Sequence, residues 1–154
     1  MANNPFLTLK QKLNKTLNNL PKKVGVLAVN HFQDNFRKQG FDGKPWKEVK
    51  RRLPIGYKTG RRSSKVRYRK GADRTRGILI GKGRLRRDIK LTLVTSDKVV
   101  ISSSVPYAAV HNLGLKAGRG AGFQMPQRQF MGNTKELTQD IENLITKEIS
   151  GAFK

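Results

Sequence analysis

Two short runs of alternating apolar and polar side chains, at residues 89–94 and 99–104, constrain the fold of this chain most strongly. A period of two is typical of a strand with one buried face. The four residues between the runs, 95–98, are polar and favour a turn, so we expect an antiparallel hairpin. Short helices are predicted on both sides of it: a single turn at 83–87, and a helix over 107–113 that follows Pro106 and ends at Gly114.

Apolar residues at helical spacing predict amphipathic helices at both ends of the chain. Pro21 interrupts the N-terminal pattern, either as a kink or as the first residue of a second helix that ends at Gly40. The C-terminal helix is predicted to be capped by Asn133, with Glu136 completing a capping box, and to end at Gly151. We interpret every stripe as a core-packing face: Phe6, Leu9, Leu13, Leu17 and Leu20; Val24, Ala28, Phe32 and Phe36; Leu137, Ile141, Leu144, Ile145 and Ile149.

The remaining segments are predicted to be irregular. Residues 116–122 contain three glycines and are interpreted as a flexible connection. Residues 123–130 are expected to be extended, with Pro126 indicating an edge strand or a crossing segment. The overall prediction is one α+β domain over residues 1–154. Its small antiparallel sheet is built on the central hairpin and covered by the N-terminal and C-terminal amphipathic helices, with a long basic loop or β-ribbon at about 54–76.

The charge of the chain is strongly positive and unevenly distributed. There are 33 Lys and Arg residues against 10 Asp and Glu, and between Lys44 and Lys90 there are 19 basic residues against three acidic ones. Such a field attracts either nucleic acid or an acidic protein surface. The candidate partner-facing residues lie in the segment 54–76, called the basic arm below: Arg61, Arg62, Lys65, Arg67, Tyr68, Arg69 and Lys70.

The sequence offers little material for an active site. Cysteine is absent, and the two histidines, His31 and His111, have no carboxylate at the spacing of a metal-binding helix. We therefore expect a non-enzymatic protein without cofactor, metal or catalytic residues. No apolar run approaches the ~18 residues of a membrane span, so a cytosolic origin without membrane contact is expected. Trp46, the single tryptophan, is predicted to anchor its loop to the core.

Several segments, taken in order, resemble the phage virion morphogenesis proteins of the Mu-like tail-completion group. They include Phe32–Phe36, the Gly43–Trp46 turn and Ile78–Ile89, which is similar to an "ILxxTGxLRxSI" segment. Tyr107–Gly114 is similar to a "YAxxHxxG" motif, and Met125–Gly132 to "IPxRPFLG".

The resemblance implies a structural protein that is made in the host cytoplasm and built into the virion of a tailed phage. It implies a homo-oligomeric ring, most simply a hexamer, at the tail top or head–tail junction, as a tail completion, terminator or neck protein. Implied partners are tail tube, connector or neck proteins, with non-specific contact to DNA in the channel. The alternative is a basic nucleic-acid-binding module. Residues implied to be structural or at interfaces are Trp46, Arg84, Tyr107, His111, Arg128 and Phe130.

Overall fold

The computed structural model describes residues 5–55 and 67–153. This part of the chain contains four helices: α1 (Pro5–Lys38), α2 (Arg84–Arg87), α3 (Ala108–Leu113) and α4 (Lys135–Ala152). It also contains three two-stranded antiparallel sheets: β1 (Gly40–Phe41) with β2 (Lys44–Pro45), β3 (Lys90–Val94) with β4 (Val99–Ser102), and β5 (Lys116–Ala117) with β6 (Phe123–Gln124). The predicted α+β class is confirmed. No helix of the described residues is long and apolar enough to cross a membrane.

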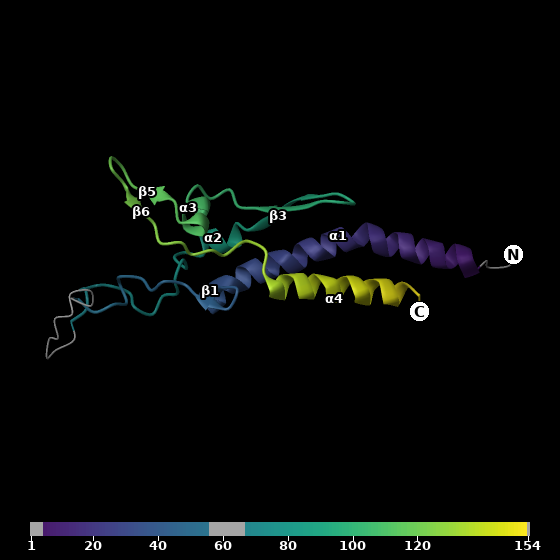
Figure 1. Cartoon of the computed structure of the whole chain (residues 1–154), viewed down its shortest axis with the longest axis horizontal. Coiled ribbons are helices and arrows are strands. Elements are labelled where there is room, and N and C mark those ends of the chain that lie inside the picture. The colour runs from purple at the N-terminus through teal and green to yellow at the C-terminus, as the bar shows by residue number, and fades with distance from the viewer. Residues whose placement is uncertain (1–4, 56–66, 154) are drawn as a thin grey trace.

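Helix α1 is the central element, with the β3–β4 hairpin on one side and α4 on the other (Figure 1). The hairpin forms where the alternating runs predict it, with Val94 paired to Val99 and Thr95–Lys98 as the turn. At Gly25 an added Cβ would lie 2.6 Å from Cδ1 of Leu91, so glycine at this position lets the hairpin approach the α1 backbone. Helix α4 runs antiparallel to α1, since Lys38 pairs with Glu136 at 2.9 Å and Lys23 with Glu148 at 2.6 Å.

Helix α1 is a single element, so the predicted second helix starting at Pro21 is wrong and the kink alternative applies. Proline removes one backbone donor and crowds the preceding turn, which bends a helix without necessarily ending it. Figure 1 accordingly shows α1 changing direction about midway along its length.

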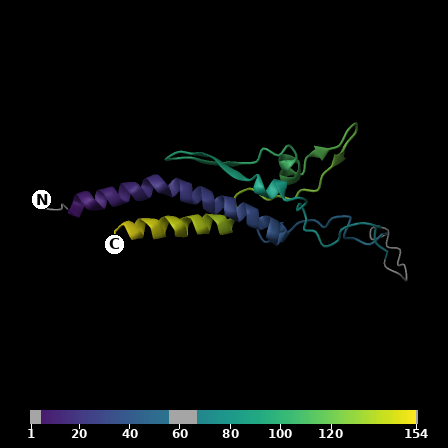
Figure 2. The same cartoon turned by 180° about the vertical axis from the view of Figure 1, so that it is seen from behind.

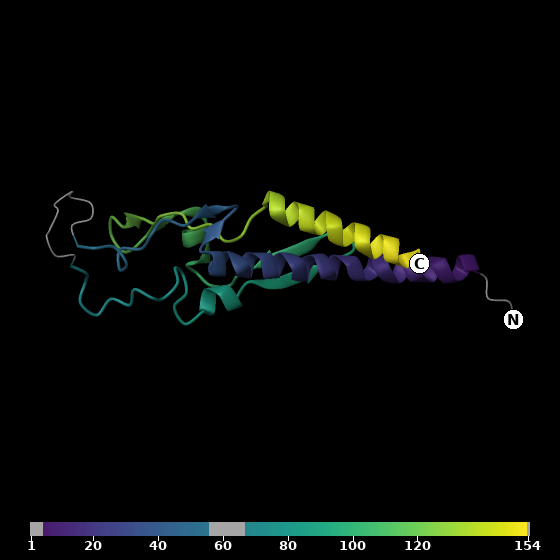
Figure 3. The ribbon, with the colours of Figure 1, turned by 90° about the horizontal axis from the view of Figure 1, so that it is seen from below.

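The N-terminal end of α1 extends beyond the C-terminus of α4 (Figure 3). The buried residues of α1 begin only at Gly25, and Phe6 and Leu17 are 80% and 45% exposed. The stripe from Phe6 to Leu20 was expected to pack into the core, but none of its residues is fully buried within one chain: Leu9, Leu13 and Leu20 are partly buried, and Phe6 and Leu17 are exposed. We call residues 5–20 the α1 overhang.

The core lies where the C-terminal half of α1 meets the loops. Phe36, Ile89 and Phe130 are its most completely buried large side chains. The ring of Phe36 contacts the Phe130 ring at a centroid distance of 5.0 Å and the Trp46 ring, edge to face, at 5.6 Å.

Two boundaries differ from the sequence prediction because side chains other than the expected ones make the decisive contacts. The cap of α4 is Thr134, not Asn133: its hydroxyl accepts a hydrogen bond from the Leu137 amide at 3.0 Å. At the other end, α4 continues through Gly151 to Ala152, which is buried.

The glycine-rich connection at 116–122 was expected to be flexible, and it is part of a short hairpin. Lys116 pairs with Gln124, and Gly118, Gly120 and Gly122 adopt the positive φ angles that its turn requires.

One carboxylate fixes the far end of the central hairpin. Asp88 accepts hydrogen bonds from the Ser103 hydroxyl at 2.8 Å and from the amides of Ser104 and Val105 at 2.6 and 3.1 Å. The Ser103 hydroxyl, followed by the Ser104 and Val105 groups, holds the pKa of Asp88 below its ordinary value. The ionised form therefore links the residue after α2 to the segment after β4.

We predict that Asp88→Asn lowers the melting temperature at pH 7, because the amide accepts fewer of these bonds. The folded-state pKa is depressed, so the contribution of Asp88 is present above the unfolded-state pKa of about 3.9 and is lost as the pH falls through the folded-state value. The difference between wild type and variant should thus shrink in acid, as measured by circular dichroism melts at neutral and acidic pH. Asp140→Asn, on the exposed face of α4, is the control. An undiminished difference in acid would contradict the assignment.

Candidate interaction site

The segment 126–132 is the meeting point of several distant parts of the chain. On one side it is held by α3: the Asn112 Oδ1 accepts hydrogen bonds from the amides of Phe130 and Met131, both at 2.9 Å, and its Nδ2 donates to the Met131 carbonyl at 3.2 Å. The Arg128 amide donates to the carbonyl of His111 at 2.8 Å. The Asn112 side chain and the main-chain bond from Arg128 to His111 thus help to fix the segment against α3.

On the other side the same segment contacts α1 and the residues after β2. The Trp46 Nε1 donates to the Gln129 carbonyl at 2.6 Å, and the Asn35 Nδ2 donates to the Phe130 carbonyl at 3.1 Å. The buried Arg128 side chain donates from Nε to the Lys47 carbonyl at 3.1 Å. Backbone groups of a buried segment outside a sheet need such side-chain partners.

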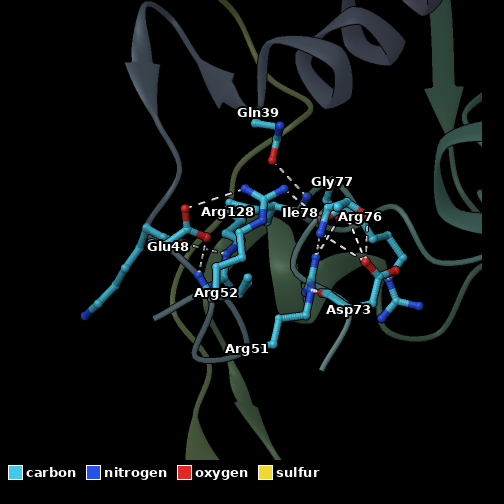
Figure 4. A network of polar contacts seen from close by, with 12 residues as sticks. Gln39, Glu48, Arg51, Arg52, Asp73, Arg76, Gly77, Ile78 and Arg128 are labelled. Carbon is cyan, nitrogen blue, oxygen red and sulfur yellow. Dashed lines mark hydrogen bonds and ion pairs between the residues drawn. The ribbon is translucent and has the colours of Figure 1, made fainter. Parts of the chain in front are cut away.

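Two arginines hold the two ends of the basic arm together (Figure 4). Arg51 donates to three carbonyls of the returning chain: Nε to Asp73 at 3.0 Å, and Nη2 to Arg76 and Gly77 at 2.6 and 2.9 Å. Arg52 also donates to the Arg76 carbonyl, at 2.8 Å, and its ion pair with Glu48 spans 3.5 Å. We call Arg51, Arg52, Asp73 and Arg76 the arm base.

Further contacts fix the geometry of the returning chain at the arm base. The Asp73 carboxylate accepts bonds from the Thr75 hydroxyl at 2.8 Å and from the amides of Thr75 and Arg76 at 3.0 and 3.1 Å. The Thr75 hydroxyl, then the two amides, lower the pKa of Asp73. Beyond this loop, the Ile78 amide donates to the Gln39 Oε1 at 2.9 Å, which ties the chain to the end of α1.

A cavity of about 310 Å³ lies between the arm base and α3. Its charged lining residues are all cationic, namely Arg51, Arg76 and Arg128, and the remaining lining residues are Val49, Gly77, Leu79, Ile80, Gly81, Leu85, Tyr107 and His111. Burial, and then the adjacent Arg128 charge, lower the pKa of His111, so its imidazole is neutral at pH 7. Within the described residues, the buried His111 Nδ1 has no hydrogen-bond partner.

The cationic side chains of this cavity are themselves partly desolvated. Burial, followed by the charges of Arg76 and Arg52, lowers the pKa of Arg51. Burial is also the main cause that lowers the pKa of Arg128; Glu48 opposes it and Arg51 adds to it. Both guanidinium groups remain charged at neutral pH because the ordinary arginine pKa is so high.

The structure separates the residues that the sequence singled out. Tyr107, His111 and Arg128 line the cavity together, whereas Trp46 and Phe130 belong to the core and Arg84 lies exposed at the first position of α2. The ring of Tyr107 meets that of His111 edge to face at 6.0 Å.

Part of the basic arm lies within the described residues. Arg67, Tyr68, Arg69 and Lys70 are exposed, and the Tyr68 ring lies 4.2 Å below the guanidinium of Arg74. Over residues 67–76 the chain forms turns and bends with no strand, while residues 56–66 of the expected loop or β-ribbon lie outside the described residues. Arg61, Arg62 and Lys65 lie outside the described residues.

Four residues of this site were not singled out from the sequence: Arg51, Arg52, Arg76 and Asn112. The arginines stood only in a count of basic residues, and Arg51 and Arg52 donate to main-chain carbonyls more than 20 residues away, one of them the carbonyl of Arg76. Carbonyls carry no sequence signal, so no local pattern could identify these bonds. Asn112 differs from the arginines because its position carries a sequence signal. An asparagine near the glycine that ends a helix often forms a hydrogen bond from its side chain to the backbone.

No arrangement typical of a metal site is found among the described residues. They contain no group of three or more His, Asp or Glu side chains that could hold a metal ion. The His31 Nε2 lies 3.1 Å from the Thr134 hydroxyl, at the start of α4, and is 103 positions away from it in sequence. What the cavity can do chemically is accept an anion.

Comparison with known proteins gives one match. The model of a family described as the phage virion morphogenesis family matches residues 3–150. Searches of curated proteins and of solved structures found no significant match.

Asn112→Ala should lower the free energy of unfolding by about 1–3 kcal/mol, because it leaves two amides and a carbonyl of the segment 126–132 without their partner. Asn143→Ala, on the exposed face of α4, removes an amide side chain of the same size and should change stability by less than about 0.5 kcal/mol. Urea unfolding measured by tryptophan fluorescence gives both values. Equal effects of the two substitutions would show that the Asn112 contacts do not fix the segment.

Proposed function

Because the chain belongs to the phage virion morphogenesis family, we propose that it is a tail completion, terminator or neck protein. In this role it forms a ring at the tail top or head–tail junction of a tailed phage and performs no catalysis. It is made in the host cytoplasm and becomes part of the virion.

The observation that carries this proposal is the α1 overhang. Its apolar stripe is at most partly buried within one chain: Phe6 and Leu17 are 80% and 45% exposed. A helical segment of about 15 residues is marginally stable in water without tertiary contacts. Contact with another subunit would bury the stripe and stabilise the helix.

A second apolar surface lies at the opposite end of the molecule. Leu113, Leu115 and Phe123, on α3 and the β5–β6 hairpin, are 58%, 44% and 57% exposed. Figures 1 and 2 place this hairpin and the arm base away from the N-terminus of α1. Two different surfaces at opposite ends suit a head-to-tail contact, and such contacts form a ring when the rotation closes. The subunit number proposed from the family resemblance is six.

The basic arm is proposed to face an acidic surface of a tail tube, connector or neck protein. Its described cations Arg67, Arg69 and Lys70 are exposed, as partner-facing residues must be. Non-specific contact with DNA in the channel is a secondary role.

The second candidate function is a basic nucleic-acid-binding module. It is favoured by the net charge of +23 and by the stacking of Arg74 on the exposed Tyr68. The arm base argues against it, because Arg51 and Arg52 donate to main-chain carbonyls and not to solvent.

Leu17→Asp should abolish incorporation into particles while leaving the melting temperature of the isolated chain nearly unchanged. Leu17 lies in the α1 overhang and is 45% exposed within one chain, and a leucine buried at a subunit contact contributes about 1.5–3 kcal/mol, equivalent to at least a tenfold loss of association. The measurement is complementation of a phage lacking its own copy, together with the mass of the purified oligomer. Gln11→Asp makes the same charge change on an exposed polar position and should complement fully. Normal complementation by Leu17→Asp would argue against the overhang as a subunit contact.

Reversing charge in the arm should separate the two candidate functions. Arg67→Glu with Arg69→Glu is expected to block head–tail joining while leaving affinity for duplex DNA unchanged, because the arm faces protein. The control is Lys135→Glu with Lys147→Glu on α4, which changes the net charge equally. Joining is scored by electron microscopy of lysates, and DNA affinity by titration at several salt concentrations. Loss of DNA affinity with joining intact would favour the nucleic-acid-binding module.

A further inference from the structure

The cavity between the arm base and α3 has two chemically different walls. One contains Arg51, Arg76 and Arg128, of which Arg51 already donates from Nε and Nη2 to carbonyls of its own chain. The other is apolar: Leu85 is buried, and Val49, Leu79 and Ile80 are partly buried against the core. A ligand that fits this cavity carries negative charge on one side and apolar groups on the other.

The positive charge of the cavity is not balanced by carboxylates at the same place. None of the acidic residues in the described part of the chain lines it. Glu48 pairs with Arg52, and the Asp73 carboxylate, 3.9 Å from the Arg76 Nε, already accepts bonds from Thr75. Among the described residues Arg128, only 6% exposed, takes part in no ion pair within 4.0 Å, and the nearby charge of Glu48 does not offset the effect of burial on its pKa. A buried cation that is only partly compensated is costly, so an incoming anion would be stabilised there.

We propose that this cavity binds a carboxylate side chain flanked by apolar groups on a partner protein of the virion. This identification of the partner rests on the proposed assembly function. The planar guanidinium groups of the wall match the two oxygens of a carboxylate. His111, which lines the cavity, is a neutral imidazole with a buried nitrogen that has no partner in the described residues, and it can donate one further hydrogen bond.

The shape of the site favours a protein carboxylate over a nucleic-acid phosphate. The depth of Arg128 places its guanidinium out of reach of the phosphates of a duplex, which contact exposed side chains. The apolar wall would face polar sugar and phosphate in a nucleic acid, whereas a glutamate between aliphatic residues would satisfy both walls. Leu79, at the apolar wall, has a φ of +58°. This conformation is costly for a bulky side chain, and such strain is concentrated at binding sites.

The test uses the full-length protein and two synthetic tripeptide amides, one with glutamate between two leucines and one with glutamine in its place. Binding is followed by NMR through the Nε–H resonance of Arg128 and the ring resonances of His111. The glutamate peptide should bind with a Kd of about 1 mM and the glutamine peptide about tenfold more weakly, since only the first forms charge-assisted bonds.

Arg76→Gln removes one half-exposed cation of the wall and should weaken the glutamate peptide several-fold without unfolding the protein. Arg119→Gln, which removes an exposed arginine outside the cavity, should leave binding unchanged. Equal binding of the two peptides, no shift at either residue up to about 20 mM peptide, or equal effects of the two substitutions would overturn the proposal. Larger shifts of the same resonances with a duplex DNA dodecamer would overturn it in favour of a phosphate ligand.

The titration is independent of the virion role. A phage that assembles without the protein would refute the proposed function and leave the peptide result standing. A failed titration, with a phage that still requires the protein, would refute only the carboxylate site.

Discussion

The fold depends on supplying hydrogen-bond partners to a buried segment that belongs to no sheet. Residues 126–132 pass between α1, α3 and the chain after β2, and their backbone groups bond to Asn35, Trp46 and Asn112. Each of these side chains comes from a different element, so the segment positions the elements relative to one another. The core follows from this arrangement: Phe130 is carried into contact with Phe36, and Arg128 is brought under α3 with its charge buried. The cavity exists because the segment and the arm base meet at that point.

The parts of the fold that could be predicted from the sequence are those in which neighbouring residues decide the structure. The alternation in β3 and β4 sets the hairpin, and Gly114, with a φ of +70°, ends α3 where expected. Features that depend on contacts between residues distant in sequence could not be predicted from the sequence. Thr134 and Asn133 are both good caps, and the contact of Thr134 with His31 from a distant helix accompanies its use as the cap. The apolar stripe of residues 6–20 has the same pattern as a core stripe, because periodicity reports that a face is to be buried and not in which chain its partner lies.

The candidate site likewise combines residues that local motifs identify with residues that only the path of the chain brings together. Tyr107, His111 and Arg128 could be singled out by their motifs, but their meeting with Arg51 and Arg76 depends on the chain returning from the basic arm. The count of basic residues treated all arginines alike. In the structure they fall into two kinds: Arg51 and Arg52 bond to the backbone of their own chain, while Arg67 and Arg69 face outward. Net charge therefore overstates how much of the positive surface is available to a partner.

Pro21 divides α1 into a C-terminal half that packs against other elements and an N-terminal segment that is at most partly buried. The half that follows Gly25 packs between the β3–β4 hairpin and α4, whereas residues 5–20, which span about 24 Å at 1.5 Å per residue, contain no fully buried side chain. A change of about 10° in the bend at the proline would move the N-terminal end of α1 by about 4 Å. In the proposed ring, small differences in helix geometry at one residue would then become differences in spacing between neighbouring subunits. The angle at Pro21, more than any surface residue, would set the curvature at which copies of this chain can meet.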